Sequence, residues 1–138
     1  MRHGGRPAAY VMIVIDSSVL IDYARKEVKL LRLFRKLKLA VCGVARAELL
    51  AGSRSVVERA KYITILNNLA QVATPESLWG VVGDYAALLG SNGVTIPLSD
   101  VIIAAVAIAT GLELWTRDKH FKLIQLFLTA LKLFQEPP

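Results

Sequence analysis

The sequence predicts an α/β protein with a mainly parallel central sheet, and three observations support that prediction. Short β-branched runs alternate with helical patterns along the chain, without internal repeats, which is typical of parallel α/β domains. The run Ile13-Val14-Ile15 is continuously apolar, as expected of a strand that is covered on both faces. The chain has 138 residues, of which 54% are hydrophobic, so it can bury the core of one domain.

The N-terminal part is predicted to contain one strand and two helices. Residues 10–15 form the strand, and Ser17 or Ser18 caps a short helix that extends to Tyr23. Residues 25–38 form an amphipathic helix with one apolar face and one basic face. We interpret the basic face as a solvated surface, with contact to the phosphates of a polyanion as the alternative.

The next part is predicted as a second strand over residues 39–44 and a helix over residues 45–51 that ends near Gly52. The segment from Ser55 to Glu58 has the form of a capping box, which begins a helix over residues 55–69. These two helices follow each other closely along the chain.

Residues 71–74 are predicted to be a short strand or a connector. Pro75 occupies the first position of another helix, which runs to Leu89 and stops in a turn cluster. We therefore expect residues 54–91 to form a helical hairpin, either an outer arm or a dimer face.

The C-terminal part begins with a brief extended segment over residues 94–98. Ser99 and Asp100 are predicted to cap a helix over residues 101–110, which is apolar all round and therefore buried. Gly111 ends this helix, and residues 112–116 form the next strand. The remaining predicted elements are a helix from residue 119 and a last strand near residues 131–134.

Four acids lie at the ends of apolar elements or within a helix made of alanine and leucine: Asp16, Glu48, Asp100 and Asp118. Each has a structural alternative. Asp16 and Asp100 are suited to helix or turn caps, Glu48 to an ion pair with Arg46, and Asp118 to a turn. Because the ends of parallel strands meet at one edge of a sheet, the four acids can converge there.

Four converging carboxylates cannot all stay ionised at neutral pH without a cation. Two carboxylates ~5 Å apart already repel each other by roughly 3 kcal/mol at an effective dielectric constant of ~20. Protonation is one way to relieve this repulsion, and a divalent metal is the other. Ligands that are all oxygen suit Mg²⁺ or Mn²⁺. The net charge of +6 favours an acidic partner, so an acidic metal site in this basic chain indicates a nuclease.

Four segments carry a family resemblance: residues 13–22, 44–52, 98–107 and 114–121. In their order and spacing they resemble the motifs of PIN-domain ribonucleases, especially the VapC-like toxins of type II toxin–antitoxin pairs. The resemblance implies a three-layer α/β/α sandwich, often dimeric, with residues 12–138 as a single PIN-like nuclease domain. Residues 1–9 are polar and contain glycine, and Met12 opens the apolar run, so we expect residues 1–11 to be a flexible N-terminal extension or the result of a mis-called start.

The resemblance also implies a Mg²⁺- or Mn²⁺-dependent endoribonuclease that is blocked by a cognate antitoxin protein and that forms a homodimer. The catalytic and metal-binding residues would be Asp16, Glu48, Asp100 and Asp118. The hydroxyls of Ser18 and Thr116 would orient Asp16 and the surrounding water. The family commonly has another acid after its fourth-motif aspartate.

At that place this chain has Lys119 and His120. We interpret His120 as a surface turn residue, with contact to a phosphate as the alternative. The main rival function is a PIN-fold module that binds RNA or a protein without cutting. A phosphatase with Asp16 as nucleophile is a further rival, although Ser18 stands where that chemistry usually has a second acid. No membrane span is visible in the sequence, and we expect a cytoplasmic protein.

Overall fold

A four-stranded parallel sheet forms the centre of the protein. The computed structural model describes residues 12–138, so the predicted extension over residues 1–11 lies outside the described part. The strands are β1 (Met12–Ile15), β2 (Lys38–Cys42), β3 (Ala70–Val72) and β4 (Glu113–Trp115). Their order in the sheet is β3-β2-β1-β4, and all three pairings are parallel. The predicted α/β fold with a parallel sheet is confirmed.

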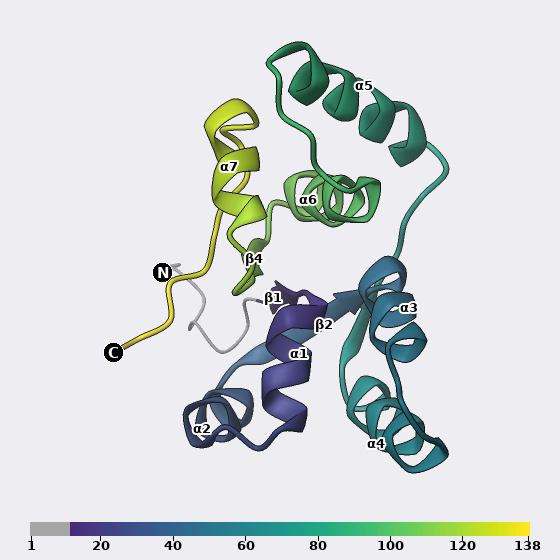
Figure 1. The fold of residues 1–138 in the computed structure, drawn as a ribbon. Coiled ribbons are helices and arrows are strands. Elements are labelled where there is room, and N and C mark those ends of the chain that lie inside the picture. Colours follow the sequence, from purple (N-terminus) through teal and green to yellow (C-terminus); the bar gives the residue numbers. More distant parts are fainter. Residues whose placement is uncertain (1–11) are drawn as a thin grey trace, which may run out of the picture.

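Helices cover both faces of this sheet (Figure 1). They are α1 (Ser17–Ala24), α2 (Val28–Lys36), α3 (Gly43–Ala51), α4 (Val56–Asn67), α5 (Leu78–Ser91), α6 (Leu98–Thr110) and α7 (His120–Phe127). Figure 1 shows α5, α6 and α7 on one side of the sheet and α1, α2 and α4 on the other, which gives the expected three layers. Helix α3 contacts both sides, through α1 and α6. Within the described residues no helix has the length and apolar character needed to cross a bilayer.

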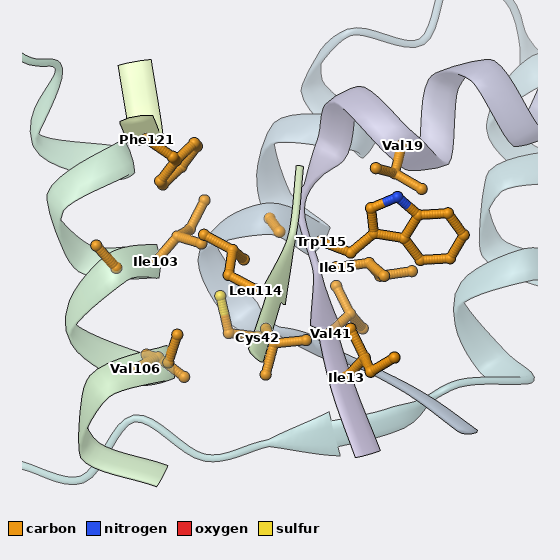
Figure 2. Close-up of a cluster of buried hydrophobic side chains, with 14 of the residues drawn as sticks. Ile13, Ile15, Val19, Val41, Cys42, Ile103, Val106, Leu114, Trp115 and Phe121 are labelled. Carbon is orange, nitrogen blue, oxygen red and sulfur yellow. The ribbon is translucent and has the colours of Figure 1, made fainter. Parts of the chain in front are cut away.

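Alternation along the strands explains why both faces of the sheet are buried. Figure 2 shows Ile13, Ile15 and Trp115 on the α1 side of the sheet and Leu114 on the α6 side. All four side chains are at most 5% exposed. Because successive side chains of a strand point to opposite faces, a fully apolar run such as β1 can supply two layers of core. Residue Asp16 follows this run directly and therefore emerges at its carboxyl end.

Several predicted helix ends are confirmed and others are wrong. Ser55 caps α4 by accepting a hydrogen bond from the Glu58 amide at 3.0 Å. Gly111 ends α6 with a φ of 70°, a conformation that favours glycine. The predicted capping of α6 by Ser99 and Asp100 is wrong, because the helix already begins at Leu98. Asp100 therefore lies in the first turn of α6.

Two larger expectations also need correction. Residues 54–91 do not form a helical hairpin, because the strand β3 separates α4 from α5. Figure 1 shows the two helices on opposite sides of the sheet. The last strand predicted near residues 131–134 is reduced to a single parallel bridge between Leu114 and Leu133. This bridge still holds the C-terminal segment against β4.

Candidate metal centre

The carboxyl ends of β1 and β4 lie side by side and carry the first part of the site. Asp16 follows β1 and is the N-cap residue of α1, so it does cap a helix. Its side chain is buried, and its Oδ1 accepts hydrogen bonds from the Ser18 amide at 3.0 Å and the Ser18 hydroxyl at 2.6 Å. Its Oδ2 accepts from the Thr116 hydroxyl at 2.6 Å. The carboxylate is thus fixed from both strand ends.

Two hydroxyls connect Asp16 to the segment that follows β4. The Thr116 Oγ1 atom, which donates to Asp16, accepts a hydrogen bond from the Asp118 amide at 2.9 Å. The Ser18 Oγ atom accepts from the Arg117 amide at 2.9 Å. Each hydroxyl therefore donates to the buried carboxylate and accepts from a backbone amide of the next turn. Asp16 and Asp118 are joined through a single side chain.

The second part of the site consists of Asp100, Asp118 and His120. One potential ligand atom from each of these residues lies within 4.8 Å of the other two. The His120 Nδ1 atom is 3.0 Å from Asp100 Oδ2 and 3.4 Å from Asp118 Oδ1. The interpretation of His120 as a surface turn residue is wrong, because it is the first residue of α7 and its imidazole contacts two of the predicted acids.

Burial raises the pKa of both Asp16 and Asp100 above the usual range. For Asp16, loss of hydration is the main cause, and the hydrogen bonds from Ser18 and Thr116 act in the opposite direction. For Asp100, burial is again the main cause, the bond from His120 lowers the pKa, and repulsion from Asp118 raises it. Such carboxylates hold their negative charge at a cost, which a bound cation would remove.

Glu48 is the predicted site residue that the structure leaves apart from the others. It lies half-buried on α3, near Cys42, whose thiol has a pKa raised mainly by burial and to a smaller extent by the charge of Glu48. Neither Glu48 nor Asp16 belongs to the group of ligand atoms formed by Asp100, Asp118 and His120. Within residues 12–138, Glu48 forms no ion pair with Arg46, whose guanidinium donates to the Asn67 side chain at 3.5 Å.

A cation that sequence reasoning did not single out, Arg117, lies between Thr116 and Asp118. Its Nη1 atom is 2.9 Å from Asp22 and 2.6 Å from Glu27, and its Nε atom is 2.7 Å from Glu136. Arg117 lowers the pKa of Glu136 to about 2, and the carboxylates raise the pKa of Arg117. Lys29 adds a fifth charge, 3.3 Å from Glu136. We call these five residues the Arg117 cluster.

The residues present fit a small divalent ion. Two carboxylates and one imidazole offer oxygen and nitrogen atoms within 4.8 Å of one another. Within residues 12–138, no lysine or arginine forms a salt bridge with Asp16, Glu48, Asp100 or Asp118. The side chains of Asp118 and His120 are 36% and 39% exposed, so the centre is open to solvent.

Known proteins share sequence features and the fold with this chain. A family model described as the PIN domain matches residues 13–125. No curated protein matches the sequence. The structure of VapBC2 from Rickettsia felis bound to a DNA fragment from its promoter has a TM-score of 0.78 and 19% identity, over 90% of this chain and 98% of the matched chain.

Two further solved structures share the fold. VapBC-1 from nontypeable Haemophilus influenzae has a TM-score of 0.74 and 19% identity, over 91% of this chain and 98% of the matched chain. VapBC-5 from Mycobacterium tuberculosis has a TM-score of 0.67 and 20% identity, over 94% and 99% respectively. The family model covers most of the chain and includes Asp16, Glu48, Asp100 and Asp118, so this chain belongs to the PIN domain family.

Proposed function

We propose that the protein is a metal-dependent endoribonuclease that acts as the toxin of a toxin–antitoxin pair. One observation carries the proposal: in a PIN domain, Asp100, Asp118 and His120 bring ligand atoms within 4.8 Å of one another. No lysine or arginine of the described part neutralises these acids through a salt bridge. A divalent cation would supply that charge.

Asp100 and Asp118 would hold the ion, and Glu48 would reach it from α3 either directly or through water. Mg²⁺ or Mn²⁺, when bound, supplies charge to a phosphodiester and acidifies water. Asp16, fixed by Ser18 and Thr116, would orient the water that attacks the phosphorus atom. The two hydroxyls therefore act as positioning groups, because their hydrogen bonds keep Asp16 in one orientation.

The substrate class follows from charge and access. The chain carries a net charge of +6, which attracts a polyanion. The basic side chains of α2 include Arg32, Arg35 and Lys36, which are exposed. An open centre in a chain of this charge suits a nucleic-acid strand better than a small metabolite. We propose RNA, in line with the ribonucleases that the four sequence motifs resemble.

An antitoxin partner is proposed because three solved structures that share this fold are VapBC proteins, one of them described as a member of the VapBC family of toxin–antitoxin systems. We also propose that the protein forms a homodimer and acts in the cytoplasm. Helix α5 exposes Trp79, Val81 and Leu88, which are 37–42% accessible and available to a second copy of the chain. Light scattering on the purified protein measures its mass and tests the dimer.

The decisive experiment is RNA cleavage by the purified chain with Mg²⁺ or Mn²⁺ and with EDTA. We expect cleavage only with metal, and a loss of roughly 10²–10³-fold in Asp16→Asn and Asp100→Asn, as is typical when one charge-stabilising group is removed. Glu76→Gln, an exposed acid in the segment before α5, is the matched control and should retain full activity.

Metal-independent cleavage, or full activity in both site variants, would refute the mechanism. RNA binding that persists without cleavage under every divalent metal would instead identify a silent PIN-fold binding module. A protein encoded beside this gene that binds the chain and stops cleavage would support the toxin role.

A further inference from the structure

We propose that His120 is a nitrogen ligand of the metal centre and that it makes the centre select Mn²⁺ over Mg²⁺. This inference rests on the proposed function and refines it. It arises from the position of the imidazole, whose Nδ1 atom lies between Asp100 and Asp118 rather than facing away from them. The acids alone leave Mg²⁺ and Mn²⁺ equally suitable.

The distances match those between neighbouring ligands of one ion. In an octahedral site with ligands about 2.1 Å from the metal, adjacent ligand atoms are about 3.0 Å apart. The His120 Nδ1 atom is 3.0 Å from Asp100 Oδ2 and 3.4 Å from Asp118 Oδ1. The imidazole nitrogen is therefore already at the spacing of a ligand that shares an ion with both carboxylates.

The backbone holds His120 in this position. Its amide donates to Asp118 Oδ1 at 2.9 Å, so the same carboxylate that faces the imidazole also fixes the start of α7. The next residue, Phe121, is 0% exposed and anchors the helix in the core beside α6. With 39% of its side chain exposed, the imidazole remains accessible to an ion from solvent.

An imidazole ligand in place of a carboxylate changes which metal ion the centre prefers. Mg²⁺ takes oxygen ligands and keeps several waters, whereas imidazole suits first-row transition ions. The family resemblance places an acid in the stretch where this chain has Lys119 and His120. Replacing a carboxylate by an imidazole removes a charge that Mg²⁺ favours and adds a donor that Mn²⁺ accepts. Relative to Mg²⁺, Mn²⁺ should therefore bind more tightly to this centre than to a centre with a carboxylate in place of the imidazole.

The test uses electron spin echo spectroscopy of the full chain with Mn²⁺, which detects a nitrogen atom bound to the ion. The wild type should show ¹⁴N modulation, and His120→Gln should lose it. The sequence contains only one other histidine, so His3→Gln is the matched control and should keep the signal. Mn²⁺ affinity should fall in His120→Gln by at least the roughly 10–100-fold that is lost when residues supporting a ligand are changed.

A third variant tests the selectivity. His120→Asp restores a carboxylate, so the preference for Mn²⁺ over Mg²⁺, measured by calorimetry, should fall by about tenfold or more, which is one step of 1.4 kcal/mol. Mn²⁺ that binds without ¹⁴N modulation, or modulation that survives in His120→Gln, would overturn the role of His120 and leave the nuclease proposal standing. Absence of any Mn²⁺ or Mg²⁺ binding would overturn both.

Discussion

The structure contains two clusters of carboxylates, the Arg117 cluster and the metal centre, and they are neutralised in different ways. In the Arg117 cluster, a guanidinium and Lys29 sit among Asp22, Glu27 and Glu136. At the metal centre, the only potentially cationic group within the described residues that contacts the carboxylates of Asp100 and Asp118 is the imidazole of His120. The same chain segment, residues 116–120, supplies both arrangements.

The pKa values show what this difference does. In the Arg117 cluster the pKa of Glu136 falls to about 2, because its charge is stabilised by hydrogen bonds from Arg117. At the metal centre the pKa of Asp100 rises, because burial removes water and Asp118 adds repulsion. The carboxylates of the Arg117 cluster stabilise the fold through their own cations. The carboxylates of the metal centre lower the stability of the metal-free fold, and binding of a cation would remove this penalty.

The largest expected effect is metal-dependent stability. At 100 times its dissociation constant, a metal that binds only the folded state adds about 2.7 kcal/mol to the free energy of unfolding. Urea unfolding with and without Mn²⁺ should show this gain in the wild type and in Glu136→Gln. Asp100→Asn should lose most of it. Equal stabilisation of Asp100→Asn would mean that the ion binds elsewhere.

Removing the internal cation should have the next largest effect. Arg117→Met leaves Asp22 without its ion-pair partner and Glu136 with Lys29 as its remaining one. We expect a loss of about 2 kcal/mol, between the values for exposed and fully buried pairs. Without metal, Asp100→Asn should instead be neutral or stabilising, because it removes a buried charge. Urea unfolding measures both variants. An Arg117→Met variant as stable as the wild type would contradict the claim that this cation stabilises the Arg117 cluster.

The smallest expected effect is on the pH dependence of the free energy of unfolding, and it has opposite signs in the two clusters. Because the pKa of Glu136 falls from 4.5 to about 2, its contribution to stability is present above pH 4.5 and is lost as the pH falls toward 2. The pKa of Asp100 is raised from 3.8, so its charged form costs stability, which declines as the pH rises through that raised value.

Thermal unfolding as a function of pH separates these contributions. Glu136→Gln should flatten the acidic limb below pH 4.5 by about 1 kcal/mol, after allowance for solvent screening. Asp100→Asn should reduce the decline at higher pH, to which Asp16 also contributes, and leave the acidic limb intact. Identical pH profiles for the two variants would contradict the comparison.

Much of the fold followed from local patterns in the sequence. An apolar strand such as β1 can carry an acid only at its end, and that rule located Asp16 at the carboxyl edge of the sheet. Gly111 ended α6 as predicted because its φ of 70° disfavours other residues. The strand β3 was predicted only as a strand or connector, because its three residues are too short and too exposed to give a hydrophobic pattern.

The rest of the site depended on contacts between distant residues. His120 is 20 positions from Asp100, and Arg117 is 19 positions from Glu136. No local periodicity links such pairs, so the sequence predicts a turn residue at His120 and indicates no role for Arg117. A basic residue placed between Thr116 and Asp118, and a histidine two positions beyond that aspartate, are the signals that could have indicated them.

The hydrogen bond between Thr116 and Asp16 joins residues 100 positions apart and therefore has a consequence for biosynthesis. At about 5–20 residues per second, the ribosome makes Asp16 roughly 5–20 s before Thr116. During that interval β1 can pair with β2, but β4, Asp118 and His120 do not yet exist. Under the proposed function, a nascent chain cannot cut RNA, including the messenger that encodes it, until residues 116–120 have been translated.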